Sequence, residues 1–115
     1  MSERSDKQLL LDMLEAIERA TRYTNGMTLE QFAKNELVCD AVMRNIQIIG
    51  EAANRTSKAL RETTTHVEWP KIIAMRHRLV HDYFEIEEGI VWRVVANYLP
   101  PLAEELRKVV SSGVE

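Results

Sequence analysis

Apolar residues recur at every third or fourth position along most of this 115-residue chain. This spacing places apolar side chains on one face of an α-helix, whereas a half-buried strand would alternate with a period of two. No segment alternates in that way for long enough to suggest a sheet. The pattern therefore predicts an all-α fold, an up-and-down helical bundle of four to five helices. Because the sequence shows no repeats and no interdomain linker, we expect a single domain covering residues 1–115.

Two of the expected helices carry broad apolar stripes. The first spans about residues 6–23 and the third about residues 36–60. A stripe of this width is typical of a helix that packs one face against a core. The expected core residues are Leu10, Met13, Leu14, Ile17 and Ala20 in the first helix, and Leu37, Val38, Ala41, Val42, Ile46, Ile49, Ala52 and Ala53 in the third.

Capping residues mark the early helix boundaries. The patterns Ser5-x-x-Gln8 and Thr28-x-x-Gln31 predict capping boxes, in which the two side chains bond each other's backbone N–H groups. The first box opens helix one, and the second opens a short second helix over residues 29–34.

Proline and a loss of periodicity mark the later boundaries. Residues 61–67 are expected to form a loop. Pro70 suits the first turn of a fourth helix, which continues to about Tyr83. Pro100-Pro101 must bend or interrupt the fifth helix, which begins near Glu87. This fifth helix carries an apolar stripe that we expect to form core or dimer interface: Val91, Val94, Val95, Tyr98, Leu102 and Leu106.

The composition, with 45% hydrophobic and 29% charged residues, is that of a soluble globular protein. No apolar run approaches the ~20 residues of a membrane helix, so no membrane partner is expected. The single cysteine, Cys39, cannot form an intrachain disulfide. We therefore expect a cytoplasmic protein. A net charge of −3 means that any attraction for nucleic acid must come from a local cluster of cations.

Gly50 lies in the middle of the long third helix, where glycine costs up to ~1 kcal/mol relative to alanine. We interpret it as a point of close approach by another helix, most simply the fourth. Glu51 follows directly and has two interpretations. It could face an arginine such as Arg76 across that contact, or it could be an ordinary solvated glutamate.

The fourth helix carries the most unusual stretch of the chain, Arg76-His77-Arg78-Leu79-Val80-His81-Asp82-Tyr83. A buried helix would gain nothing from so many groups that are costly to desolvate. The stretch is rich in cations, whereas residues 82–88 contain four acids and no base. Positive potential is therefore expected along the fourth helix.

Within this stretch the pattern Arg-x4-His-x-Tyr, formed by Arg76, His81 and Tyr83, resembles the signature of the HEPN superfamily of small helical ribonucleases. The chain looks most similar to the HepT-type toxins of that superfamily. The resemblance spans about residues 8–110. Further matching segments are Ile49-Gly50-Glu51-Ala52-Ala53, Trp69-Pro70 and Ile90-Val91-Trp92.

The resemblance implies an endoribonuclease that uses no cofactor and no metal, and that leaves a 2′,3′-cyclic phosphate and a 5′-hydroxyl. It also implies a homodimer in which the motif helices pair across a two-fold axis. The partner would be a minimal nucleotidyltransferase antitoxin, which transfers AMP to Tyr83. Many relatives have a small polar residue after the arginine, where this chain has His77.

The residue types fit this chemistry. His81 could remove the proton of the ribose 2′-OH or protonate the leaving oxygen, because imidazole titrates near neutral pH. Arg76 presents a planar fork of donors for the phosphate charge of the transition state, and Tyr83 could bind phosphate or orient His81. His77 could be a second acid–base group or a polar filler, and Arg78 is an additional cation. On an ideal helix Arg76 and His81 lie roughly 140° apart, which favours a site completed by a second copy.

Two other interpretations stay open. His77 and His81 stand at i and i+4, a spacing that can chelate zinc in a metal-dependent hydrolase. Alternatively, the chain is a non-catalytic helical module that binds a nucleotide or a protein. His66, in the expected loop, is interpreted as a structural histidine.

Overall fold

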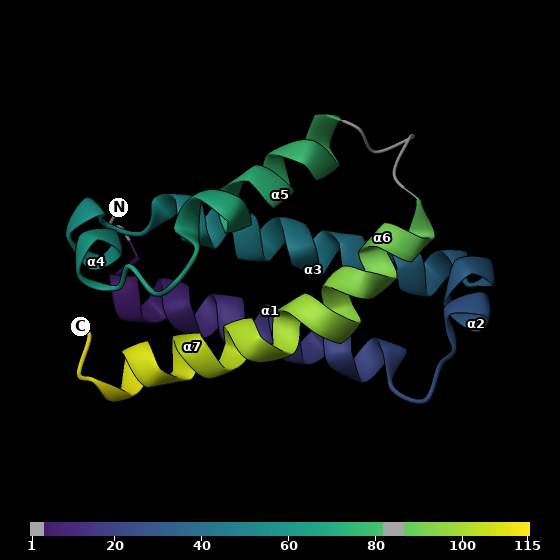
Figure 1. The fold of residues 1–115 in the computed structure, drawn as a ribbon, viewed down its shortest axis with the longest axis horizontal. Helices are drawn as coiled ribbons and strands as arrows, with labels where there is room; N and C mark the ends of the chain where they lie inside the picture. Colours follow the sequence, from purple (N-terminus) through teal and green to yellow (C-terminus); the bar gives the residue numbers. More distant parts are fainter. Residues whose placement is uncertain (1–3, 82–86) are drawn as a thin grey trace.

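The computed structural model describes residues 4–81 and 87–115, and within these ranges the side chains of all residues except 79–81. The described residues are almost entirely helical and contain no strand (Figure 1). The predicted all-α bundle is therefore confirmed. In chain order the elements are α1 (Asp6–Thr24), α2 (Leu29–Lys34), α3 (Glu36–Arg55), α4 (Lys58–Thr63), α5 (Trp69–His81), α6 (Glu88–Arg93), the π-helical turn η2 (Val94–Tyr98) and α7 (Leu99–Ser111).

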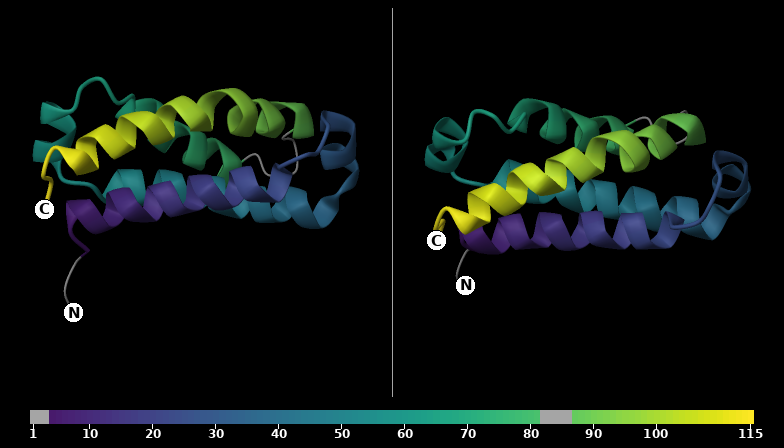
Figure 2. Two further views of the ribbon diagram at one scale, coloured as in Figure 1. Left: turned by 90° about the horizontal axis from the view of Figure 1, so that it is seen from below. Right: turned by 60° about the horizontal axis from the view of Figure 1, so that its bottom comes forward.

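The long helices α1 and α3 lie side by side, with α7 against α1 and α5 against α3 (Figure 2). At one end of the bundle, α2 packs on α6, where the rings of Phe32 and Trp92 lie 5.4 Å apart. The core between the helices is aliphatic apart from the buried Phe32 and Trp69 rings. Its largest fully buried side chains are Phe32, Leu10, Met13, Ile46, Ile49, Ile72, Leu99, Leu106 and Val42.

Both predicted capping boxes are present. The Ser5 hydroxyl accepts the backbone N–H of Gln8, and the Gln8 side chain accepts that of Ser5. Thr28 and Gln31 make the same pair of bonds at the start of α2. These reciprocal bonds satisfy two otherwise unpaired donors at each helix start.

The third helix is shorter than the sequence pattern suggested. It ends at Arg55 rather than near residue 60, because Thr56 is extended and Ser57 begins a new helix. The Ser57 hydroxyl accepts the N–H of Leu60 and donates to a carboxylate oxygen of Asp6 at 2.6 Å. The expectation of a loop over residues 61–67 was therefore wrong at its start, since α4 continues to Thr63.

Leu37 was also wrongly expected in the core. It is 80% exposed, although the next residue, Val38, already packs against the core. Leu37 lies at the edge of the apolar face of α3, about 140° around the helix from the buried Val42. The remaining stripe positions of α1 and α3 are buried or half-buried, as predicted.

The proline pair interrupts the last helix in the way its chemistry demands. Proline has no N–H to donate to a preceding carbonyl, and the chain before Pro100-Pro101 takes a π-helical turn. The N–H of Leu99 bonds to the carbonyl of Val94, five residues back. Within the stripe Val91, Val95, Leu102 and Leu106 are buried, while Val94 and Tyr98 are half-buried. None of the described helices is long and apolar enough to span a membrane.

Candidate functional site

The start of α5 is fixed by a buried tryptophan. Trp69 is only 3% exposed, and its indole N–H donates to the Thr64 hydroxyl at 3.0 Å. That hydroxyl donates in turn to the carbonyl of Leu60 in α4 at 2.6 Å. Because its N–H has a hydrogen-bond partner, the indole can be buried without an unpaired donor. The packed ring then fixes the orientation of the helix. Pro70 is the second residue of the helix, in the first turn as predicted.

Farther along, α5 crosses α3 at Gly50. A Cβ built on Gly50 would overlap the Cβ of Arg76 and would lie 2.9 Å from its Cγ and 3.1 Å from its Cα. Only glycine allows the two helices to approach so closely. The interpretation of Gly50 as a contact point for the motif helix is therefore confirmed, and its partner is the motif arginine itself.

Arg76 is half-buried by this contact and lines an open groove of about 1100 Å³. Its side chain makes no hydrogen bond or ion pair with any residue that the structure describes. His77, which is exposed and has an interaction partner, lines the same groove. The groove lies between the end of α3, α4 and the first half of α5; its lining residues are Asn54, Lys58, Arg61, Glu62, Thr65, Val67, Trp69, Pro70, Ile73, Ala74, Arg76 and His77.

Sequence reasoning missed two cations of this groove, Lys58 and Arg61. Both come from α4, which was expected to be helix end and loop. Arg61 donates to the carbonyl of Thr56 at 2.9 Å, and its Nε is buried with no partner among the described residues. The signal that could have revealed the pair was Ser57, because a cap there places positions 58 and 61 one turn apart on one helix face.

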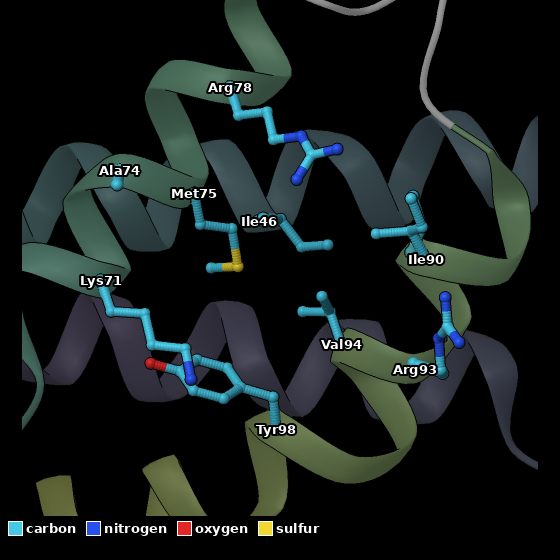
Figure 3. A pocket seen from close by; sticks show the side chains of 10 residues that line it. Ile46, Lys71, Ala74, Met75, Arg78, Ile90, Arg93, Val94 and Tyr98 are labelled. Atoms are coloured by element: carbon cyan, nitrogen blue, oxygen red, sulfur yellow. The ribbon is translucent and has the colours of Figure 1, made fainter.

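Arg78 does not join this groove. It lines a separate pocket of about 430 Å³ between α5, α6 and η2 (Figure 3). Two positions along a helix correspond to a rotation of about 200°, so Arg76 and Arg78 face opposite sides of α5. The cluster of cations seen in the sequence is therefore divided between two hollows.

Glu51 proves to be an exposed residue that lines a groove between α1 and α3, together with Asp12 and Arg19. It makes no ion pair with Arg76 among the described side chains. Of the two interpretations, the solvated glutamate is the one the structure supports. His66 lies in the loop before α5, with its Nε2 3.4 Å from a carboxylate oxygen of Glu105 in α7. This position fits the structural role expected for it.

His81 is the last described residue of α5, but its side chain lies outside the described part of the structure, as do Asp82 and Tyr83. Their roles stay predictions. The described residues contain no group of three or more metal-ligating side chains. The zinc interpretation pairs His77 with His81 and so extends beyond these residues.

The fold and the motif helix define a class of small helical proteins, and comparison with known proteins identifies the family. A family model described as ribonuclease HepT-like matches residues 13–109. The chain therefore belongs to the HepT-like ribonuclease family of the HEPN superfamily. No solved structure matches the chain significantly.

Several curated proteins are similar to this chain. A Methanocaldococcus jannaschii protein named as a candidate RNase is 31% identical over 110 residues, covering 96% of this chain and 91% of the relative. A protein of Thermococcus cleftensis named as a probable ribonuclease HepT is 32% identical over 108 residues, covering 91% of this chain and 98% of the relative. A longer M. jannaschii protein, named as a γ-glutamylcyclotransferase and candidate RNase, is 36% identical over 92% of this chain. The chain spans about half of that relative, 48%.

The contact at Gly50 can be tested by adding one methyl group. Gly50→Ala should lower the free energy of unfolding by about 1–2 kcal/mol, because the cost of overpacking exceeds the gain of up to ~1 kcal/mol in helix propensity. Gly89→Ala in α6 is the matched control, since nothing lies within 4 Å of a Cβ there. It should be neutral or stabilising by up to ~1 kcal/mol. Urea denaturation of wild type and the two variants measures these changes. Equal changes in the free energy of unfolding at both glycines would contradict the close contact at Gly50.

Proposed function

We propose that this protein is a metal-independent endoribonuclease that cleaves RNA by attack of the ribose 2′-OH on the adjacent phosphate, and that it acts as the toxin of a toxin–antitoxin pair. The observation that carries the proposal is the placement of Arg76. Its stem is seated on Gly50, and its guanidinium has no acidic partner among the described residues. An arginine used only to hold two helices together would be expected to pair with an acid across them. An arginine that binds phosphate would have its aliphatic part packed in place and its guanidinium free of an acidic partner.

Arg76 would hold the scissile phosphate. The guanidinium stays charged at any working pH and forms two parallel bonds to phosphate oxygens. Negative charge grows on those oxygens as the 2′-oxygen attacks, so a preplaced cation stabilises the transition state more than the ground state. The close contact with Gly50 restricts the Cβ and Cγ atoms of Arg76. The side chain therefore needs less reorganisation to stabilise the transition state.

His81 would carry the proton chemistry. As a base it takes the proton of the 2′-OH while the 2′-oxygen forms its bond to phosphorus. The bond from phosphorus to the 5′-oxygen then breaks, and an acid must supply a proton to that oxygen. The products are a 2′,3′-cyclic phosphate and a 5′-hydroxyl, with no water or metal consumed in the step. His77 lies beside Arg76 in the groove, which supports it as the second acid–base group.

The groove around Arg76 suits a single RNA strand. Its lining residues include one acid, Glu62, and four basic residues, which are Lys58, Arg61, Arg76 and His77. Lys58 lies 3.8 Å from Glu62 across exposed surface, a pair that phosphate could readily replace. Proteins that bind single strands combine a positively charged groove with surfaces on which bases lie. Here the apolar surface between the cations is mainly aliphatic, from Val67, Pro70, Ile73 and Ala74.

Cleavage should depend on both motif residues and should persist in EDTA. His81→Ala should reduce the rate by about 10²–10⁴-fold. Arg76→Lys, which keeps the stem on Gly50 and the charge but loses the fork of donors, should also slow cleavage while preserving thermal stability. Arg107→Ala, an exposed arginine on α7, is the control and should match wild type. The assay follows a labelled RNA and the same sequence with 2′-deoxyribose at the cleaved position.

An uncut 2′-deoxy substrate and a cyclic phosphate product are the expected results. Cleavage of the 2′-deoxy substrate at the normal rate would rule out attack by the 2′-OH. Activity lost in EDTA and restored by zinc would favour the metal interpretation of His77 and His81. RNA binding without any cleavage would favour the non-catalytic module.

We further propose that the active unit is a homodimer, with the two motif helices near the two-fold axis. Arg76 and His81 stand five positions apart, roughly 140° around one regular helix. A second copy would therefore bring the His81 of one chain toward the Arg76 of the other. Mixing Arg76→Lys with His81→Ala chains should restore part of the activity, because one of the two composite sites then holds both native residues. No recovery in a mixture shown by light scattering to be dimeric would contradict the shared site.

Control by a nucleotidyltransferase antitoxin is the last part of the proposal. Tyr83 stands seven positions after Arg76, and an adenylate placed there would bring a phosphate toward the cation of the RNA groove. It would then exclude RNA by bulk and by like charge. After incubation with the nucleotidyltransferase and ATP, mass spectrometry should find AMP on the peptide containing Tyr83. Equal silencing of a Tyr83→Phe variant would contradict this assignment.

A further inference from the structure

A second hollow lies on the other side of α5 from the groove of Arg76. It has a volume of about 430 Å³ and opens between α5, α6 and η2 (Figure 3). Its floor is apolar, formed by Ile46, Met75, Ile90, Val91 and Val94. This volume falls within the ~300–1,000 Å³ typical of small-ligand sites. We call it the α5–η2 pocket.

Cations surround this apolar floor. Lys71, Arg78 and Arg93 all line the pocket. Figure 3 shows Arg78 extending from α5 over the opening, and Lys71 lying against the Tyr98 ring at the other end. The Lys71 ammonium lies 5.0 Å from the centre of that ring. Arg78 and Arg93 make no hydrogen bond or ion pair with the residues that the structure describes. Lys71 pairs with Glu68 at 3.9 Å, so Arg78 and Arg93 are the cations of this pocket that have no acidic partner among the described residues. An apolar floor beside these two arginines fits a ligand that has a flat apolar part and an anionic part.

The wall of the pocket is formed by an unusual piece of backbone. Val94 and Tyr98 are the first and last residues of the π-helical turn η2. π-helical turns are rare and occur frequently at functional sites. Burial, and then the negative charge of Glu68, raises the pKa of the Tyr98 hydroxyl. That hydroxyl therefore stays protonated into alkaline solution and can donate a hydrogen bond.

We propose that the α5–η2 pocket binds one unstacked nucleotide of the RNA strand, the neighbour of the nucleotide that is cut. The base would lie on the apolar floor, and its phosphate would contact Arg78 and Arg93. This inference rests on the proposed ribonuclease function. The link between the two sites is Ala74, which is exposed and lines both the groove and the pocket. A strand crossing α5 over this small side chain would place a phosphate beside Arg76 and the adjoining base in the pocket.

Chemistry favours a nucleotide over a second copy of the chain. An exposed apolar patch can also serve as a dimer contact, and in that case acids of the second copy would have to meet Arg78 and Arg93, because charges desolvated without partners are costly. RNA supplies both the flat apolar surface and the negative charge. Bases splayed out of single strands commonly stack on aromatic rings or on arginine guanidinium planes, and this pocket offers Tyr98 and Arg78 for such contacts.

The test uses RNA that cannot be cleaved, so that it reads binding independently of catalysis. A fully 2′-O-methylated oligonucleotide is titrated against wild type and Arg93→Glu. Arg107→Glu, the same change at an exposed position on α7, controls for net charge. A second oligonucleotide carries an abasic site beside the position of the scissile phosphate. Light scattering on each variant follows the oligomeric state.

Arg93→Glu should weaken binding of the intact oligonucleotide by about ten-fold or more relative to Arg107→Glu. The abasic site should weaken binding to wild type by about five-fold or more, the lower end of the range for a base stacked on an aromatic ring, and should weaken binding to Arg93→Glu much less. With cleavable RNA, Arg93→Glu should raise KM and leave kcat unchanged, whereas His81→Ala lowers kcat. If wild type shows these binding differences but does not cleave RNA, the proposed function is overturned and the nucleotide pocket is not.

Equal binding by the two glutamate variants would overturn the proposal, as would an abasic penalty of the same size in wild type and Arg93→Glu. If Arg93→Glu instead dissociates a dimer while each subunit binds RNA normally, the pocket is a contact between two copies of the chain.

Discussion

The close approach of α5 to α3 at Gly50 is the contact on which the site depends. Glycine in a helix costs up to ~1 kcal/mol, and here the missing side chain is the space that the stem of Arg76 occupies. Any larger residue would separate the two helices or shift α5 along α3. The buried Trp69 fixes the start of α5, and Gly50 fixes its crossing point. Between them they determine where the motif residues of that helix can lie.

This crossing also explains why α5 presents two different surfaces. One side carries Arg76 and His77 into the open groove with α4. The other carries Arg78 and Met75 into the apolar α5–η2 pocket. A helix buried on both sides would have no room for RNA, and a helix exposed on both sides would not hold an arginine in place. α5 lies between these cases, because it packs closely on α3 along one face while small residues such as Ala74 remain at the surface.

The helices could be predicted from sequence because their signals are local. Capping boxes at Ser5 and Thr28 mark two helix starts, and a 3.6-residue period identifies the core faces of α1 and α3. The break at Thr56 was missed, because the apolar spacing continues weakly across it and only the extended backbone of that residue ends the helix. Leu37 was misplaced for a related reason. Periodicity predicts which face of a helix is apolar but does not predict how much of that face the neighbouring helices cover.

The candidate site was predictable only in part. The motif residues could be recognised from their types and spacing, and Gly50 from its cost in a helix. Lys58 and Arg61 were missed, because their place in the groove depends on the fold of α4, whose cap at Ser57 was the one local signal for it. The separation of Arg76 from Arg78 follows from helix geometry, but the hollows that receive them are formed by elements distant in sequence. The α5–η2 pocket likewise depends on a π-helical turn that the proline pair suggests but does not specify.

A double-mutant cycle in the free energy of unfolding can show whether the absent side chain of Gly50 makes room for the aliphatic part of Arg76. Arg76→Gly removes the Cβ and Cγ atoms that a methyl group at position 50 would meet. Gly50→Ala should destabilise the native background and should be clearly less destabilising when position 76 is glycine, where the Cα at 3.1 Å is the one close neighbour that remains of residue 76. The coupling energy should be at least about 1 kcal/mol, as expected for residues in contact. Additive effects of the two substitutions would show that Gly50 does not make room for Arg76.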